Sequence, residues 1–403
     1  MAAHRGLVAV FGSTLFQLSG VFMLLPLLLF LLKRGEVSNT VAGLFAATEW
    51  LGIFIVTPFA SAIARAMGRR NALWLASVTP PLTAFGFLFT DQLAAWFVLL
   101  LLGAMAGGMR WVLAEAFIAE FAPPQHRGLL IGAYATMIGM TMVVGPALLA
   151  WLGADDPAAL RIVIGFMLIG LVWTALIPRL PQDQDSDTAR VGLIGLWHAV
   201  RANPVVMLAG FVGGFFEMGL SSVLPIYGLS LGLPAGQAAL LLSLSGLGGT
   251  LCAIPAGMVA DRFASPELGR RRLMVLLAVL LLFSGALVLA VEQLTVLVWA
   301  VALLWGSAGG TLYTLTMFDI GSRETGITLV NSTAVLVLTY TLGALVASSA
   351  AGLMLDWSPS VGLSLMLMTV AGGGALAFLR SARALAVHTQ DLSALIDTHV
   401  DAK

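Results

Sequence analysis

The chain has 403 residues, of which 59% are hydrophobic and 10% are charged, and its twenty basic residues equal its twenty acidic residues in number. The mean hydropathy is +0.99, whereas soluble domains carry roughly 25% charged residues. These values exclude an ordinary soluble domain and predict a protein that crosses a membrane many times.

Long apolar runs follow one another along the chain, separated by short polar or Gly/Pro-marked breaks. A helix needs about 20 mostly apolar residues to cross the bilayer core. The first run begins near Leu7 without a small-residue cleavage site, so we expect it to be retained as the first helix. We therefore predict an all-α membrane protein with twelve transmembrane helices, over 7–32, 40–64, 71–90, 93–118, 128–152, 158–178, 204–229, 236–260, 272–291, 294–318, 326–354 and 359–380.

The basic residues are unevenly distributed between the two sides of the predicted membrane. With the N-terminus inside, sixteen of the twenty lie on one side, and Lys33, Arg34 and Arg161 lie on the other. Short cytoplasmic loops retain Lys and Arg. We expect both termini to be cytoplasmic, in a bacterial inner membrane.

The most polar internal stretch, "PRLPQDQDSDTARVGLIGLWHAVRANP" (178–204), divides the predicted helices into six and six. We expect two six-helix bundles, 1–180 and 204–383, joined by a cytoplasmic linker at 181–203 and followed by a cytoplasmic tail at 384–403.

The two halves also repeat each other, as in transporters built from parallel repeats. "AGGMRWVL" (106–113) in the fourth run lies over "AGGTLYTL" (308–315) in the tenth, which matches Trp111 with Tyr313. Gly52 of the second run matches Gly249 of the eighth.

The loop after the eighth run reads "GMVADRF" (257–263) and then "GRRR" (269–272). It resembles the G-x-x-x-D-R-x-G-R-R motif of the major facilitator superfamily, which implies two six-helix bundles that rock about a central site. The resemblance also implies a cytoplasmic gate or latch, here formed by Gly257, Asp261 and Arg262. We expect Asp319, at the end of the tenth run, to be interfacial.

The corresponding loop in the first half, "ASAIARAMGRR" (60–70), departs from the motif, because Ala60 and Ala64 replace its Gly and Asp. Its basic residues Arg65, Arg69 and Arg70 remain as candidates for the gate or for binding lipid headgroups. "RWVLAEAF" (110–117) further resembles the W-x-x-x-E pattern of a bacterial branch of the superfamily, the YcaD-like proteins.

Apart from charges at the helix ends, four charged residues fall inside the predicted helices: Glu49, Arg110, Glu115 and Glu217. Charges in the bilayer interior cost at least about 2.5–3.5 kcal/mol each, so they tend to face a cavity or one another. Arg110 and Glu115 are about 140° apart on their helix, so we expect Arg110 to pair with Glu49 of the second helix. The alternative is a permanent buried salt bridge that only fixes helix packing.

The three glutamates are candidates for proton coupling. Burial disfavours the charged form of a carboxylate without a basic partner, so Glu217 is the leading candidate to take up and release a proton. The alternative is a neutral, hydrogen-bonded Glu217 with no part in transport. Glu115 is either a second proton site or a carboxylate bonded to Trp111.

The remaining candidates are residues that offer a substrate a hydrogen bond, an aromatic wall or a charge. For each uncharged residue in this set, the alternative role is helix packing or anchoring at the membrane interface. They are Gln17, Arg110, Trp111, Tyr134, Tyr227, Tyr313 and Asn331.

We predict a secondary transporter of a small organic solute, with proton-coupled efflux of a drug or metabolite as the first hypothesis. The alternative is proton-coupled or facilitated uptake of a small nutrient, or of an organic anion bound by Arg110. The second alternative is a transporter-like solute sensor. All five histidines lie in termini or loops and Cys252 is the one cysteine, so we expect no enzyme, metal site or cofactor. The expected partners are the solute, protons and lipid, without nucleic acid, and the expected state is a monomer.

Overall fold

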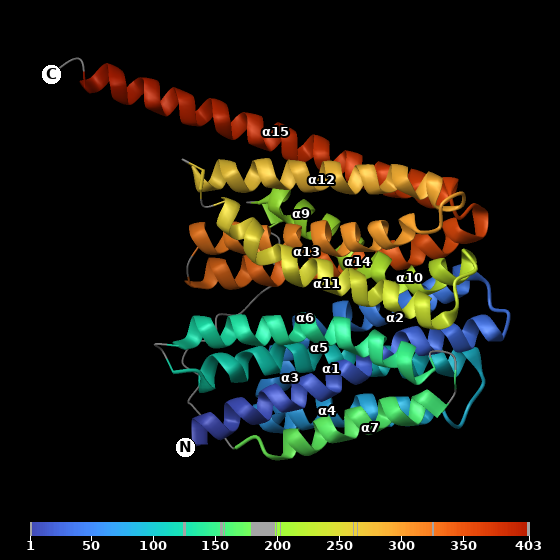
Figure 1. Cartoon of the computed structure of the whole chain (residues 1–403). Coiled ribbons are helices and arrows are strands. Elements are labelled where there is room, and N and C mark those ends of the chain that lie inside the picture. Colours follow the sequence, from blue (N-terminus) through green and yellow to red (C-terminus); the bar gives the residue numbers. More distant parts are fainter. Residues whose placement is uncertain are drawn as a thin grey trace.

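The computed structural model describes residues 2–123, 126–153, 156, 158–178, 198, 200–201, 203–260, 262–263, 265–324 and 326–400. The described chain is a bundle of long helices in two halves. Figure 1 shows the N-terminal half, in blue to green, beside the C-terminal half, in yellow to red. Most of the predicted linker 181–203 lies outside the described residues.

The first half follows the six apolar runs predicted for it. Pro58 divides the second run, because proline lacks the N–H that a continuous helix requires. Its elements are α1 (Ala2–Arg34), α2 (Asn39–Val56), the 3-10 turn η1 (Thr57–Phe59), α3 (Ala60–Met67), α4 (Arg69–Gly86), α5 (Leu93–Phe121), α6 (Arg127–Leu152) and α7 (Ala158–Ala175).

The second half likewise follows the remaining six runs. Its first run is interrupted by one π-helical turn, η3, between two α-helical segments. Its elements are α9 (Pro204–Gly214), η3 (Phe215–Gly219), α10 (Leu220–Ser230), α11 (Ala235–Ala260), α12 (Pro266–Val291), α13 (Leu297–Arg323), α14 (Gly326–Trp357) and α15 (Val361–Val400).

Eleven helical stretches of the described chain are long and apolar enough to cross a membrane. The one predicted run that is not among them is the third, 71–90, which corresponds to α4; this helix begins with Arg69, Arg70 and Asn71 and contains Pro80 and Pro81. α15 extends well past the predicted end at residue 380 and projects from the bundle toward the C-terminus (Figure 1).

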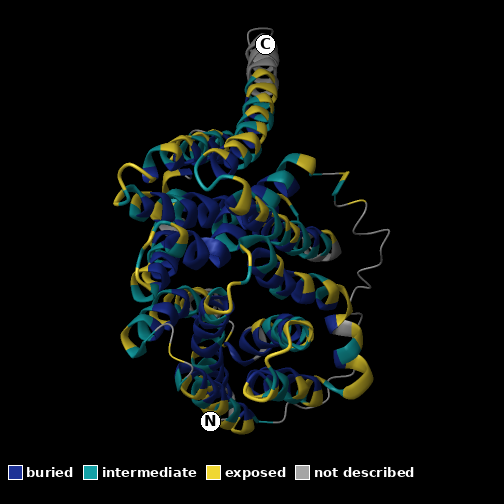
Figure 2. Ribbon diagram, turned by 90° about the vertical axis from the view of Figure 1, so that its right-hand side faces the viewer, coloured by how far each residue is buried: buried dark blue, intermediate teal, exposed yellow. Residues whose placement is uncertain are grey.

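The outer surface of the bundle is apolar. Large hydrophobic side chains such as Leu82, Phe89, Val172 and Leu376 are at least 59% exposed, and Figure 2 shows buried residues gathered within each bundle. Such a surface is suited to lipid chains.

Within each half the predicted repeat is visible in the packing. α2 packs on α5 and α11 packs on α13. The matched glycines lie in these equivalent contacts: Gly52 approaches the backbone of Leu101 and Gly249 approaches that of Gly306. A side chain at either position would hold the two helices apart.

The halves meet mainly through α2 against α14 and α6 against α11. We call the end of the molecule where α1 begins and α15 ends the terminal side, and the opposite end the far side (Figure 1). On the far side, the Asp356 carboxylate at the end of α14 accepts hydrogen bonds from the backbone N–H groups of Asn39 (3.0 Å) and Thr40 (2.7 Å) at the start of α2. These contacts close the far side between the halves.

Candidate functional site

Arg110 lies on α5 with its side chain directed toward α1. Its Nη2 donates to Ser13 Oγ at 2.7 Å and lies 3.5 Å from Thr14 Oγ1, and only 5% of the residue is exposed. Thr14 also shares a hydrogen bond of 3.1 Å with the Tyr134 hydroxyl of α6. Hydroxyl groups on α1 and α6, rather than a carboxylate, therefore surround this guanidinium.

The predicted Arg110–Glu49 pair is wrong for this arrangement of the helices. Within the described part of the chain Arg110 makes no ion pair, and its buried Nε has no hydrogen-bond partner. The reason is rotational, because Arg110 points to α1 while the α2-facing side of α5 carries Gly108, whose neighbours are Ile53 and Val56.

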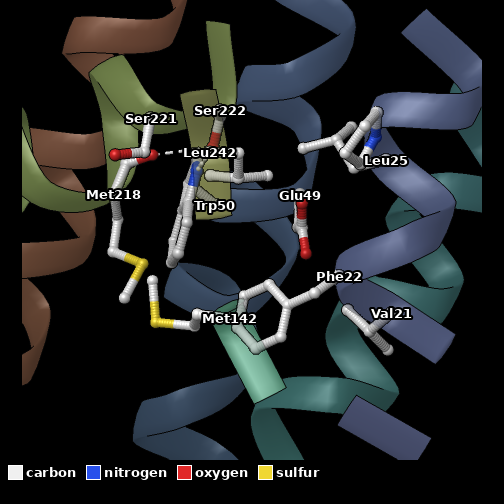
Figure 3. A pocket seen from close by; sticks show the side chains of 11 residues that line it. Val21, Phe22, Leu25, Glu49, Trp50, Met142, Met218, Ser221, Ser222 and Leu242 are labelled. Atoms are coloured by element: carbon white, nitrogen blue, oxygen red, sulfur yellow. Dashed lines mark hydrogen bonds between the residues drawn. The ribbon is translucent and has the colours of Figure 1, made fainter. Parts of the chain in front are cut away.

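Glu49 instead faces a pocket between the two halves. This inter-half pocket is small, with a volume of about 30 Å³, and is lined by α1, α2, α6, α10, α11 and the η3 residue Met218. Figure 3 shows the Glu49 carboxylate beside Phe22 and Leu25, with Trp50 and Met142 on the neighbouring wall. No hydrogen bond or ion pair to Glu49 occurs among the described residues.

Trp50 joins the halves at this pocket. Its Nε1 donates to Ser222 Oγ of α10 at 3.1 Å, shown dashed in Figure 3. Nearby, Ser243 Oγ of α11 donates to the Val143 carbonyl of α6 at 2.8 Å. The pocket therefore lies where the two halves are held together.

Glu115 and Trp111 are on one face of α5, as the sequence spacing predicts. The indole Nε1 of Trp111 donates to Glu115 Oε1 at 2.7 Å, and the Glu115 side chain is exposed. The charge of Glu115 lies within electrostatic reach of Tyr313 on α13. Glu115 thus takes the hydrogen-bonded form that the sequence left as an alternative.

Glu217 sits in the π-helical turn η3, whose wider backbone ring is frequent at functional positions. The Tyr340 hydroxyl of α14 donates to Glu217 Oε2 at 2.7 Å. A Cβ at Gly310 of α13 would lie 2.6 Å from Glu217 Oε1, and one at Gly249 of α11 would lie 3.2 Å from the same oxygen. The hydrogen bond from Tyr340 and the close approach of Gly249 and Gly310 therefore hold the Glu217 carboxylate in place.

Sequence reasoning did not identify Tyr340 as a member of this site. Its ring packs against that of Tyr313, with centroids 4.8 Å apart. Tyr313 lies within reach of the charges of both Glu217 and Glu115. The eleventh run contains a single tyrosine, Tyr340, which is buried. The spacing of residues in that run does not determine that this side chain faces the seventh helix.

The other predicted binding residues are dispersed. Gln17 donates from Nε2 to the Ser77 carbonyl at 2.9 Å, a carbonyl left without its helical donor because residue 81 is proline. Its Oε1 has no hydrogen-bond partner in the described structure, and neither has Tyr227 Oη or Asn331 Oδ1. The inter-half pocket includes none of these three.

The terminal side of the second half contains a buried charge cluster that the sequence did not assign. Asp319, which we expected to be interfacial, lies near the end of α13 and has a fully buried side chain. Arg270 Nε donates to Asp319 Oδ1 at 3.2 Å and Arg271 Nη2 donates to Oδ2 at 3.0 Å. Arg323, one turn later on α13, pairs with the same carboxylate and with Glu267 at 3.4 Å.

The predicted latch is only partly within the described structure. Asp261 lies outside the described residues, whereas Arg262 is exposed just after α11. Gly257 packs against Phe318, where a Cβ would lie 2.6 Å from the ring. The basic run after the eighth helix thus supplies Arg270 and Arg271 to Asp319.

In the first half, the basic residues of the equivalent loop are more accessible. Arg65 is exposed on α3 and Arg70 is half-buried at the start of α4. The guanidinium of Arg69 lies 5.7 Å from the centroid of the Phe117 ring on α5. This geometry fits a cation–π contact between the loop and α5.

Comparison with known proteins places this arrangement of helices in a family. The model of the Major Facilitator Superfamily matches residues 10–336. The MFS-type transporter YcaD of Salmonella paratyphi A is 24% identical over 367 residues, which cover 90% of this chain and 92% of that protein. The MFS-type transporter YfkF of Bacillus subtilis is 25% identical over 271 residues, so the match spans 66% of each chain, just under two thirds.

Solved structures show the same fold. The nucleoside transporter NupG matches with a TM-score of 0.74 at 14% identity, over 93% of this chain and 98% of that chain. A D-xylose-proton symporter matches with a TM-score of 0.73 at 16% identity, over 94% and 97%. At these identities the likeness concerns the fold alone.

Proposed function

The chain belongs to the Major Facilitator Superfamily and is a secondary transporter with many membrane-spanning helices, and from this premise we propose that it expels a small amphipathic, cationic solute in exchange for protons. The observation that carries this proposal is Glu49, a carboxylate that has no partner among the described residues and lies in an apolar pocket between the halves. A carboxylate in such surroundings needs either a proton or a cation to offset its charge. Because a proton and a cationic solute bind the same carboxylate in turn, the movement of one is coupled to the movement of the other.

Alternating access supplies the transport path in this proposal. The halves are joined on the far side by Asp356 with Asn39 and Thr40, and at the pocket by Trp50 with Ser222. We assign the terminal side, with both termini, to the cytoplasm of a bacterial inner membrane. Solute then enters from the terminal side, and rocking of the halves breaks the far-side contacts and releases it.

Glu217 is the proposed second proton site. Its carboxylate is half-buried and has no basic partner among the described residues, while Tyr340 holds one of its oxygens. Tyr313 lies within reach of the charges of both Glu217 and Glu115, so a charge change at either carboxylate acts on the same side chain. The protein acts in this proposal as a monomer.

The test is proton movement in proteoliposomes that contain the purified protein and an internal pH dye. A panel of cationic, neutral and anionic solutes is added outside, with wild type, Glu49→Gln, Glu217→Gln and the exposed-loop control Glu36→Gln compared. We expect cation-dependent proton flux in wild type and Glu36→Gln, and flux near background in Glu49→Gln and Glu217→Gln. Absence of solute-dependent flux with every member of the panel would contradict proton coupling.

The glycine beside Glu217 gives a sharper prediction. Gly310→Ala places a methyl group 2.6 Å from Glu217 Oε1, so the carboxylate must shift and its hydrogen bond from Tyr340 weakens. A hydrogen bond to a charged group contributes about 1.5 kcal/mol, so we expect coupled flux to fall about tenfold. Gly321→Ala, on the same helix with nothing within 4 Å of its Cβ, is the matched control and should keep wild-type flux. Equal flux in the two variants would show that the carboxylate position is unimportant.

A second candidate function is transport of an organic anion, because Arg110 lacks a carboxylate partner in the described structure. A guanidinium held only by hydroxyl groups retains capacity to bind a carboxylate or phosphate. Flux with anions alone in the same assay, lost in Arg110→Gln, would favour this function over cation efflux.

A further inference from the structure

A second cavity lies inside the N-terminal half, and we call it the inner cavity. It has a volume of about 80 Å³ and is lined by α1, α2, α4, α5 and α7, with Glu49, Ile53, Phe87, Leu100, Gly107 and Met167 among its wall residues. This volume is several times the roughly 10–15 Å³ that one water molecule needs by the same measure. The inner cavity therefore has room for a small ligand within one bundle, next to the inter-half pocket with which it shares Val21, Leu25 and Glu49.

Glu49 belongs to the walls of both the inner cavity and the inter-half pocket. The side chain is half-buried in α2, so its carboxylate is accessible from these spaces. Of the residues that line the two cavities, it is the one that carries a formal charge. Glu49 therefore stands at the junction between them.

The other polar groups on these walls already have partners. In the inner cavity Thr83 Oγ1 donates to the Pro80 carbonyl at 3.0 Å. In the inter-half pocket Ser222 Oγ donates to the Met218 carbonyl at 2.7 Å, and Ser221 shares a hydrogen bond of 2.6 Å with Ser245. The Glu49 carboxylate is the group left to bind a ligand.

We propose that the inner cavity binds the apolar body of a small amine whose ammonium group pairs with Glu49. Charge-assisted N–H···O bonds to a carboxylate are roughly twice as strong as neutral ones, and a desolvated carboxylate without a partner is costly. The apolar walls bind an aromatic or aliphatic body, and an anion meets only the like charge of Glu49. This inference rests on the proposed function and adds to it the place and chemical class of the solute.

The shared position of Glu49 also provides a route for the amine. An ammonium group bound at Glu49 stays on the same carboxylate while the apolar body moves from the inner cavity into the inter-half pocket. The charge is then never without its partner during transfer through the hydrocarbon region.

The test is equilibrium binding to the purified full chain in detergent micelles by titration calorimetry. The probe is 1-naphthylmethylamine, with 1-naphthylmethanol and 1-naphthoate as neutral and anionic compounds with the same aromatic body. We expect the amine to bind at least tenfold more tightly than the other two, and Glu49→Gln to weaken amine binding about 10- to 100-fold. Equal binding of the three compounds would overturn the proposal.

Gly107→Leu tests the inner cavity itself. A Cβ at Gly107 has nothing within 4 Å, so the new side chain enters the cavity without meeting a neighbour at its base. Gly165→Leu is the matched control, since its Cβ on α7 also has open space and Gly165 lines neither cavity. We expect amine binding to fall at least tenfold in Gly107→Leu and to be unchanged in Gly165→Leu, with both variants eluting as wild type in gel filtration.

The outcomes separate this inference from the proposed function. Binding that survives Gly107→Leu but is lost in Glu49→Gln would place the amine in the inter-half pocket and overturn the inner-cavity assignment. Cation-driven proton flux together with no amine binding to wild type would overturn the inference while cation efflux stands. Amine binding that depends on Glu49 and Gly107, without any proton flux, would support the inference and contradict the coupling.

Discussion

Replacing Asp319 with asparagine is expected to destabilise the protein by about 3–5 kcal/mol, because removal of one member of a buried ion pair leaves the other charge buried and uncompensated. Asp319 is fully buried, and the side chains of its partners Arg270 and Arg271 are 8% and 7% exposed. The carboxylate ties the start of α12 to the end of α13. The measurement is the unfolding midpoint of the purified protein in mixed micelles, with increasing denaturant.

Glu267→Gln is the control for this prediction. Glu267 contacts Arg323 at 3.4 Å, but both side chains are about one third exposed, 34% and 33%. Exposed ion pairs contribute about 0–1 kcal/mol. Equal losses of stability in the two variants would show that the cluster acts only as a surface ion-pair network.

Replacing Gly43 with leucine is expected to abolish transport by preventing closure of the far side. A Cβ at Gly43 on α2 would lie 2.6 Å from the Ser348 carbonyl and 2.7 Å from Gly352 Cα, both backbone atoms of α14 that cannot move independently. Overpacking costs about 1–3 kcal/mol, enough to reduce the far-side-closed population about 5- to 150-fold. Solute flux in proteoliposomes should fall to background.

The structural readout distinguishes a blocked gate from a misfolded protein. Spin labels at Glu36→Cys and Val361→Cys, on far-side segments of the two halves and in a Cys252→Ser background, report the separation across the gate. We expect a longer distance in Gly43→Leu and an unchanged distance in Gly321→Leu, whose Cβ meets open space. Loss of flux with an unchanged distance would contradict the gating explanation.

The amino-acid sequence by itself determined the class of protein and the course of its helices. Apolar runs of about 20 residues have one stable solution in a bilayer, since the backbone must satisfy its hydrogen bonds within each segment. All twelve runs accordingly appear as helices or helical segments, and the YcaD-like resemblance carried by Trp111 and Glu115 is confirmed by the relatives. The i, i+4 spacing of these two residues also predicted their shared face, because the geometry of a single helix fixes it.

Tertiary structure decided which charges have partners. Arg110 binds Ser13 and Thr14 instead of Glu49, and Glu217 receives its hydrogen bond from Tyr340, more than a hundred residues later. Helices that cross at different angles and rotations present different faces to their neighbours, and no spacing within one segment specifies that rotation. A buried polar group requires a partner, but the sequence offers several hydroxyls and carboxylates at similar depth, and only packing selects among them.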